Sequence, residues 1–178
     1  SAKAAVNIPA LKPAVLEPVK DYMKIAENIG GLAFQLAEGN LKSISIEVKG
    51  SLADLDISPL QIAILKGIFS SVTEGVNYVN APVIAKQRGI NVVTSKSQKD
   101  CTYIGSITVK LLTDEDEQTV TGALIAEHMP RIVAINEHKM SIEPDEHMLI
   151  IPHVNQPGMI AKVATVIGKD NVNISRMH

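Results

Sequence analysis

Several residue types are scarce in this chain of 178 residues, and each scarcity excludes a class of function. Cys101 is the single cysteine, so the chain has no internal disulfide and we expect a reducing, cytoplasmic environment. Two Phe, three Tyr and no Trp leave few of the aromatic side chains on which nucleic-acid bases stack. The five histidines share no metal-ligand spacing with one another, so we expect no metal site.

Long apolar runs and a strong charge of one sign are also lacking. No segment approaches the roughly eighteen apolar residues of a membrane-spanning helix, and no signal peptide is recognisable. A net charge of −2 gives no electrostatic reason to expect nucleic acid or an anionic membrane as a partner. Hydrophobic residues make up 46% of the chain and charged residues 20%, which is typical of a folded domain rather than a disordered one.

The first half of the chain carries the clearest helical patterns. Apolar residues keep helical spacing from Val19 to Leu36, with Gly30-Gly31 as a weak point in the middle. Residues 43–49 alternate between apolar and polar, which predicts a half-buried strand. A capping box at 58–61, with proline at the first helical position, predicts a second helix that extends to about Thr73.

The second half is dominated by strand patterns. After a short helix that closes at Arg88-Gly89, the pattern predicts strands over 90–94, 103–112, 118–126, 131–135 and 139–142. Helices grouped early and strands grouped late predict an α+β fold for residues 13–143, with a mixed sheet and helices.

The C-terminal stretch has a pattern of its own. Residues 149–151 begin an apolar strand, 153–158 form a turn, and the following residues mark one face of a short helix. Gly168 stands where a left-handed helix-ending residue is expected. Residues 171–174 begin a second strand, so the stretch predicts a β-α-β segment.

The turn before this helix is a candidate ligand site. Free N–H groups at a helix N-terminus attract a small carboxylate. The side chains of His153, Asn155 and Asn173, with the amides of Gly158 and Met159, offer groups for an amino acid's α-carboxylate and α-ammonium. The alternative is a polar turn whose Asn and Gly residues only serve backbone geometry.

A basic corner is the second candidate site. Arg131 begins one predicted strand, and His138 with Lys139 begins its partner across a tight turn, so the three groups are expected to converge. Arg offers a bidentate fork and Lys a point charge for a phosphate-like anion. The alternative is a solvated hairpin corner without a ligand.

Two sets of motifs carry a family resemblance. The pattern H-x-N-x-P-G-M-I-A-K-V over 153–163, followed by N-V-N-I, resembles the opening of an ACT domain, a ferredoxin-like module that senses amino acids. The segments 76–82, 85–90 and 131–136 resemble the allosteric substrate-binding domain of D-3-phosphoglycerate dehydrogenase, which precedes the ACT domain in the long enzyme. The start at 5–11 resembles the segment that leaves the catalytic domains of that enzyme.

The resemblance implies a domain plan. Residues 1–12 are a linker from missing catalytic domains, 13–143 an allosteric substrate-binding-like domain, and 147–178 the N-terminal half of an ACT domain. The ferredoxin-like module is then incomplete, and its first strand has an unpaired edge. We expect this tail to be poorly ordered or to pair with a second copy in a homo-oligomer.

The resemblance also implies a function. The family oxidises 3-phosphoglycerate with NAD at the start of L-serine biosynthesis, and serine commonly inhibits it. The fingerprint G-x-G-x-x-G and the catalytic trio of the family are absent here, so we expect no catalysis and no cofactor in this chain, with NAD bound by the parent oxidoreductase. Allosteric sensing is the expected role: His153, Asn155, Gly158, Met159 and Asn173 would bind L-serine or a similar amino acid.

Arg131, His138 and Lys139 would bind the anion, although Glu143 stands where some relatives carry a basic residue, which reduces the expected anion affinity. Two other interpretations remain open. The chain is the regulatory region of an iron–sulfur L-serine dehydratase in the first, and a purely structural oligomerisation module in the second. A self-sufficient enzyme is disfavoured because no nucleophile–base pair or cofactor loop is recognisable.

Overall fold

The computed structural model describes residues 11–98, 101–145 and 147–178. The chain divides into two compact units, Ser1–Pro144 and Asp145–His178. Within the described ranges, every helix is too short or too polar to cross a lipid bilayer.

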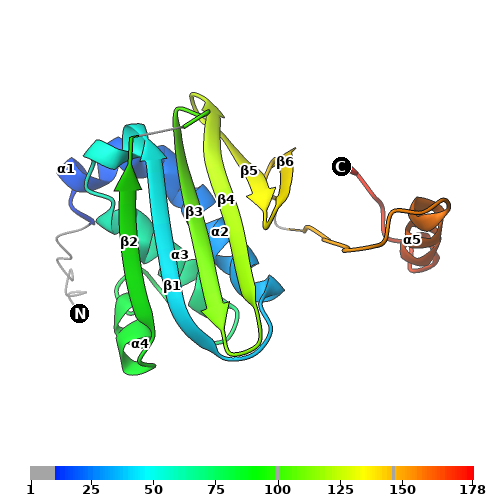
Figure 1. The fold of residues 1–178 in the computed structure, drawn as a ribbon, viewed down its shortest axis with the longest axis horizontal. Helices are drawn as coiled ribbons and strands as arrows, with labels where there is room; N and C mark the ends of the chain where they lie inside the picture. Colours follow the sequence, from blue (N-terminus) through cyan, green and yellow to red (C-terminus); the bar gives the residue numbers. More distant parts are fainter. Residues whose placement is uncertain (1–10, 99–100, 146) are drawn as a thin grey trace, which may run out of the picture. The chain divides into compact units, whose positions relative to one another are not determined.

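The first unit is built on a six-stranded sheet with the order β2-β1-β3-β4-β5-β6 (Figure 1). The strands are β1 (Leu41–Gly50), β2 (Asn91–Ser97), β3 (Gly105–Thr113), β4 (Glu117–Ala126), β5 (Met129–Ile135) and β6 (His138–Ile142). β1 and β2 are parallel, while the pairs from β1 through β3, β4 and β5 to β6 are antiparallel. A parallel pair needs a long crossover, which α3 (Ser58–Ser70) and α4 (Ala81–Gln87) supply here. The predicted α+β class is therefore confirmed.

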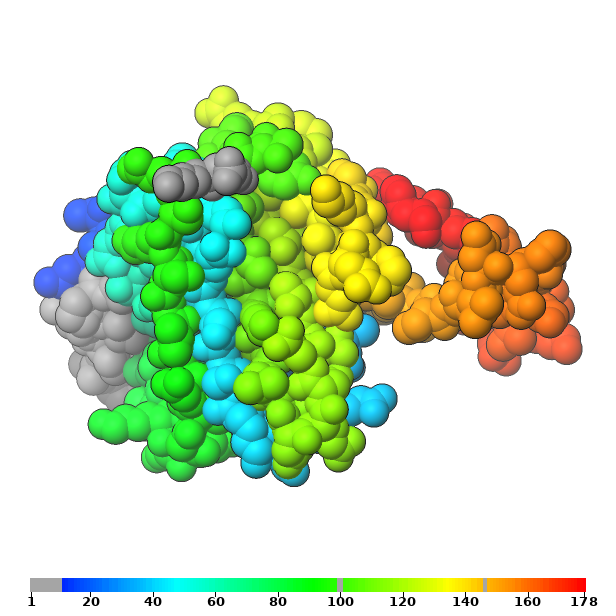
Figure 2. Space-filling model, viewed as in Figure 1, coloured from blue at the N-terminus to red at the C-terminus, as the bar shows by residue number. Residues whose placement is uncertain are grey.

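The helices gather on one face of this sheet. The chain enters through α1 (Pro13–Leu16) and η2 (Glu17–Val19), and continues into α2 (Lys20–Leu36); η3 (Ser51–Asp54) follows β1. α2 and α3 lie behind the strands, and α2 contacts β3, β4 and β5 (Figure 1). On the other face the strands themselves form the surface (Figure 2). The alternation in β1 follows from this arrangement, because Ile44, Ile46 and Val48 face the helices and are buried.

The glycine pair in α2 mediates helix packing and does not interrupt the helix. α2 is continuous from Lys20 to Leu36, and a Cβ added at Gly30 would lie 2.5 Å from the carbonyl oxygen of Ile64 in α3. On the other helix, a Cβ at Gly67 would collide with the carbonyl oxygen of Glu27. The two helix backbones therefore touch directly, which requires residues without side chains at the contact.

The predicted capping box at the start of α3 is wrong. No side chain caps this helix at its N-cap residue, Ile57. The backbone N–H and hydroxyl of Ser58 both donate to Asp56 Oδ1, at 3.0 and 2.6 Å, and these bonds lower the pKa of Asp56. Gln61 donates instead to Thr94 Oγ1, at 2.5 Å. The carboxylate of Asp56 is the stronger acceptor, so it takes the role that the sequence assigned to the serine hydroxyl.

The second unit contains one helix, α5 (Met159–Lys169), and the two strands predicted at 149–151 and 171–174 are absent from its described residues. A strand is stabilised by hydrogen bonds to a neighbouring strand, and neither segment has such a neighbour in this unit. The predicted helix end is also shifted: α5 runs through Gly168, and the left-handed residue is Asn171, with φ 55°. No described residue from 145 onwards is buried. The expected β-α-β pairing is therefore not formed.

Candidate functional sites

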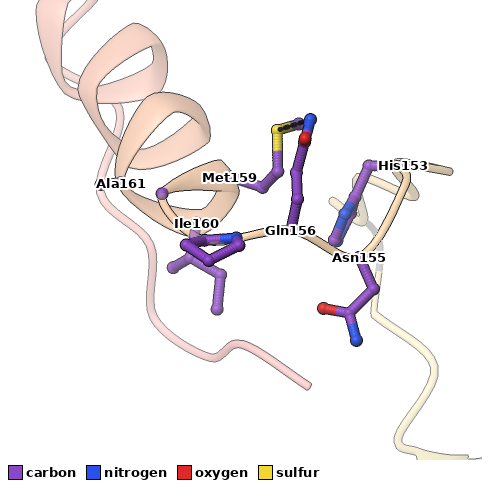
Figure 3. A pocket seen from close by; sticks show the side chains of 8 residues that line it. His153, Asn155, Gln156, Met159, Ile160 and Ala161 are labelled. Carbon is purple, nitrogen blue, oxygen red and sulfur yellow. Dashed lines mark hydrogen bonds between the residues drawn. The ribbon is translucent and has the colours of Figure 1, made fainter.

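A surface depression surrounds the start of α5 in the second unit. It is lined by His153, Asn155, Gln156, Pro157, Gly158, Met159, Ile160 and Ala161 (Figure 3). Four of the five residues predicted for amino-acid binding lie here together. The fifth, Asn173, is not among the lining residues, because the strand that was expected to carry it past the turn is not formed.

The backbone donors of this depression lie two residues further along the chain than the predicted pair, Gly158 and Met159. Gly158 has φ 86° and precedes the first helical residue, Met159, whose N–H points to the Gln156 carbonyl oxygen at 3.4 Å. The first regular helical bond runs from the N–H of Lys162 to the carbonyl oxygen of Gly158, at 3.0 Å. The N–H groups of Ile160 and Ala161 therefore have no intrahelical acceptor and are the donors available to a carboxylate. The sequence placed the start of the helix directly after Gly158, as observed, but the local pattern did not indicate that the Met159 N–H would be directed at the Gln156 carbonyl oxygen.

The side chains around these donors differ in what they offer. His153 Nδ1 lies 3.0 Å from the carbonyl oxygen of Val154, which can only accept, so Nδ1 donates and Nε2 is an acceptor in the neutral ring. The Gln156 amide donates to Met159 Sδ at 3.6 Å, and this pair lies on one side of the turn (Figure 3). The Asn155 amide points away from that pair (Figure 3). Asn155 thus keeps both its donor and its acceptor for a ligand.

The basic corner of the first unit lies on the β5–β6 hairpin. Gly122 of β4 faces α2, where a Cβ would lie 2.5 Å from Ile25 Cγ1, so its strand neighbours Thr121 and Ala123 face the uncovered side of the sheet. In the sheet, Arg131 pairs with Ala123 of β4. Ala134 pairs with Thr121 on one side and with Lys139 on the other, so these three residues lie side by side across the strands. Paired residues point to the same side, so Arg131 and Lys139 both face the uncovered side.

The register brings two of the three basic residues together. Thr121 and Ala123 are two residues apart in β4, so Lys139 and Arg131 are separated by roughly 7 Å along the strand direction. Both side chains are long enough to contact the same anion across this distance. His138 follows the alternation and points to the opposite side of β6. The expected convergence of all three groups is therefore not observed, and one anion would contact Arg131 and Lys139.

Arg131 is held by two contacts at the open end of the hairpin. Its Nη1 donates to the carbonyl oxygen of Pro130 at 2.9 Å, and its Nη2 lies 3.6 Å from Glu143 Oε2. The Arg131 side chain is 19% exposed and that of Glu143 52% exposed. The guanidinium thus already has a carboxylate partner, which an incoming anion would have to replace.

The segment 76–82, which carries part of the family resemblance, contributes Tyr78 to a cluster that stabilises the fold. Tyr78 donates to Glu27 Oε2 at 2.8 Å, and Lys66 Nζ lies 2.5 Å from Glu27 Oε1 and 4.7 Å from the centre of the Tyr78 ring. Burial and the hydrogen bond to the Glu27 carboxylate raise the pKa of Tyr78 to about 12. Burial opposes ionisation of Glu27, but its bonds to Lys66 and Tyr78 outweigh burial and lower its pKa. This cluster fastens the connection between α3 and α4 to α2.

A metal site has no support in the described ranges: they contain no group of three or more His, Cys, Asp or Glu residues placed around a common point. The described residues thus form an α+β domain with one helix-covered sheet face, followed by a small helical unit with a polar depression.

This chain belongs to the family of D-3-phosphoglycerate dehydrogenase intervening domains, whose sequence model matches residues 18–136. The D-3-phosphoglycerate dehydrogenase of Synechocystis sp. is 39% identical over 178 residues, a match that covers 99% of this chain and 32% of that protein. The corresponding protein of Bacillus subtilis is 33% identical, covering 98% of this chain and 33% of that protein. For Methanocaldococcus jannaschii the identity is 32%, over 99% of this chain and 33% of that protein.

The chain therefore spans about a third of the length of these relatives. It corresponds to the regulatory region of a D-3-phosphoglycerate dehydrogenase, namely the intervening domain with the residues that follow it. The resemblance drawn from the motifs is confirmed for this family. The ACT identity of the second unit and the ligands of both sites stay predictions.

Proposed function

We propose that this chain senses an amino acid, with L-serine as the candidate, for a parent enzyme that oxidises 3-phosphoglycerate with NAD. The observation that carries the proposal is the free helix start of α5, where the Ile160 and Ala161 amides lie beside His153 and Asn155. The membership in a family of dehydrogenase intervening domains supports the metabolic context.

The chemistry of the depression matches the two charged groups of an amino acid. The helix amides and the positive end of the helix dipole favour the α-carboxylate. The Nε2 atom of His153 and the side-chain oxygen of Asn155 are acceptors for the α-ammonium group. The Asn155 amide nitrogen remains for the serine hydroxyl.

The openness of the depression predicts weak binding by a single copy. His153 and Asn155 are exposed, whereas a tight small-molecule site encloses most of its ligand. We propose that 147–178 is the first part of an ACT domain and that a second copy closes the site in a homo-oligomer. In that arrangement serine would bind two domain geometries with different affinity, which is what allosteric control requires.

Titration with L-serine, monitored by amide NMR shifts, tests the amino-acid proposal because it detects weak binding. We expect shifts at Ile160 and Ala161 that saturate, and a loss of affinity of about tenfold in Asn155→Ala, the equivalent of one or two hydrogen bonds. Asn173→Ala is the matched control, since the same amide is removed outside the depression, and it should bind normally. Unchanged Ile160 and Ala161 signals at saturating serine would contradict the proposal.

We further propose a phosphate-like anion site formed by Arg131 and Lys139 on the uncovered face of the sheet. The support is the position of both residues on the same side of the sheet, about two residues apart along the strands, together with the low exposure of the Arg131 side chain. His138 is then a neighbour of the site and not a ligand.

Titration with inorganic phosphate tests the anion site. Arg131→Ala and Lys139→Ala should each weaken binding about tenfold, and His138→Ala should leave it within twofold. Equal losses in all three variants would instead indicate a general charge effect. If neither serine nor phosphate binds, the chain is better explained as a structural oligomerisation module; the family match leaves no support for the iron–sulfur dehydratase.

A further inference from the structure

Glu143 occupies a particular position between the proposed anion site and the exit of the first unit. It follows the last residue of β6, Ile142, and precedes Pro144, the final residue of the unit. Its Oε2 atom lies 3.6 Å from Arg131 Nη2. Glu143, a carboxylate partner of the Arg131 guanidinium, is thus also the residue through which the chain leaves the sheet.

We infer that Glu143 is a built-in competitor of the anion, so that anion binding at Arg131 releases Glu143 and loosens the exit of β6. This inference rests on the proposed anion site and adds a regulatory step to it. When the anion replaces the Glu143 carboxylate, Arg131 still has a negatively charged partner, so it is paired both with and without the anion. What changes is the tether on the segment after Ile142.

The strengths of the two contacts favour the exchange. The Glu143 side chain is half exposed and its oxygen is 3.6 Å from the guanidinium, so the pair is of the weak, solvent-screened kind. A phosphate offers more negative charge and can accept two parallel N–H bonds from Arg. The Arg131 bond to the Pro130 carbonyl, at 2.9 Å, is made by Nη1 and holds the side chain in place during the exchange.

The local structure makes the exit sensitive to this tether. β6 has five residues and pairs with β5 through only three register positions, with an irregularity between Ile132 and Ala134. The outermost of these positions is Ile132 with Ile142, directly before Glu143. Since Arg131 adjoins Ile132, the Arg131–Glu143 contact extends this short pairing by one side-chain link.

Glu143→Gln tests the competition, because it keeps the side-chain size and removes the charge. We expect it to tighten the binding of inorganic phosphate by about threefold to fivefold, the range that a weak ion pair allows. Glu74→Gln is the matched control, with the same charge change on an exposed residue between α3 and α4, and it should leave the affinity unchanged. Equal affinities of wild type and Glu143→Gln, or an equal gain in both variants, overturn the inference.

Amide hydrogen exchange tests the release. In the wild type, phosphate should speed exchange at Ser141, Ile142 and Glu143 by at least threefold, whereas in Glu143→Gln these amides should exchange fast with or without phosphate. Unchanged or slower exchange on phosphate binding in the wild type contradicts the release. These failures are distinct from failure of the anion site itself, in which neither the wild type nor Glu143→Gln binds phosphate at all.

Discussion

Gly67 shows most directly how a single position holds the fold together. The backbones of α2 and α3 meet at Gly30, Gly31 and Gly67, and the free space for an added methyl group differs at each. At Gly67 the methyl group would collide with the Glu27 carbonyl oxygen, at Gly30 it would lie 2.5 Å from that of Ile64, and at Gly31 it would lie 3.3 Å from that of Gly67.

We therefore predict a graded loss of stability in three alanine variants. Gly67→Ala should lower the free energy of unfolding by about 3 kcal/mol, Gly30→Ala by about 2 kcal/mol and Gly31→Ala by less than about 1 kcal/mol, because backbone atoms must move apart in that order. Urea unfolding measures all three. Gly168→Ala is the control, since nothing lies within 4 Å of its added methyl group. A reversed order would show that the helices do not meet as described.

Tyr78 provides a prediction for alkaline pH. Its pKa is about 12 in the folded chain against an ordinary 10.0, so the folded state holds the phenolic proton more tightly than the unfolded state. The resulting stabilisation is complete below about pH 10 and is lost as the pH rises towards 12. Between pH 9 and pH 11 the free energy of unfolding, measured with urea, should fall further in the wild type than in Tyr78→Phe, by an amount on the order of 1 kcal/mol once solvent screening is considered.

A residual loss is expected in Tyr78→Phe, because burial also raises the pKa of Tyr22 despite its hydrogen bond to Ser51. An identical pH dependence in the wild type and Tyr78→Phe would contradict the described contact between Tyr78 and Glu27.

Among the elements, α5 differs from the others because it has no core to pack against in its own unit. It has no buried residue, and Ile160 and Val166 are 64% and 63% exposed. An isolated helix of 11 residues is marginal in water. Hydrogen exchange measured at a protein concentration at which the chain is monomeric should therefore be fast throughout α5, within about a hundredfold of an unstructured peptide, whereas α2 should be strongly protected. Protection of α5 equal to that of α2 would indicate a partner surface for its apolar side.

The elements also show how far sequence patterns reach. Alternation over 43–49 and helical spacing from Val19 predict β1 and α2, because each pattern directly reflects which face is buried. The strands at 149–151 and 171–174 were predicted by the same kind of pattern, yet they are not formed, since pairing depends on neighbours that a local pattern does not specify. The Asp114 carboxylate accepts bonds from the Asn40 backbone N–H, at 2.6 Å, and side chain, at 3.0 Å, a link across 74 positions that no local pattern indicates.

The candidate sites were predictable to a similar degree. His153 and Asn155 lie at the depression because the turn and the helix after it are local features. The amides of Ile160 and Ala161 lie two residues after the predicted pair, because the Met159 N–H is directed at the Gln156 carbonyl oxygen, a contact that the local pattern does not indicate. Arg131 and Lys139 share a side only because of the register irregularities in β5, and these depend on tertiary packing.

For the whole molecule, the exposed apolar side of α5 predicts self-association. The chain has a mass of 19.1 kDa, and the apolar side of α5 is exposed in the single copy. We predict a mass near twice this value by light scattering at high protein concentration, because two copies can bury these side chains against each other. Val166→Asp should shift the equilibrium towards the monomer, and Val93→Asp, an exposed position in β2, is the control. A monomer at every concentration would contradict the homo-oligomer proposal.

The order of the strands has a consequence for how this domain can move. β6 lies at one end of the sheet and contacts chiefly β5, whereas α2 packs on β3, β4 and β5. Detaching β6 would break a few backbone hydrogen bonds at the edge of the sheet and would not expose the core to water. The domain can thus give its outgoing chain a new direction at a small free-energy cost, while everything beneath α2 remains folded.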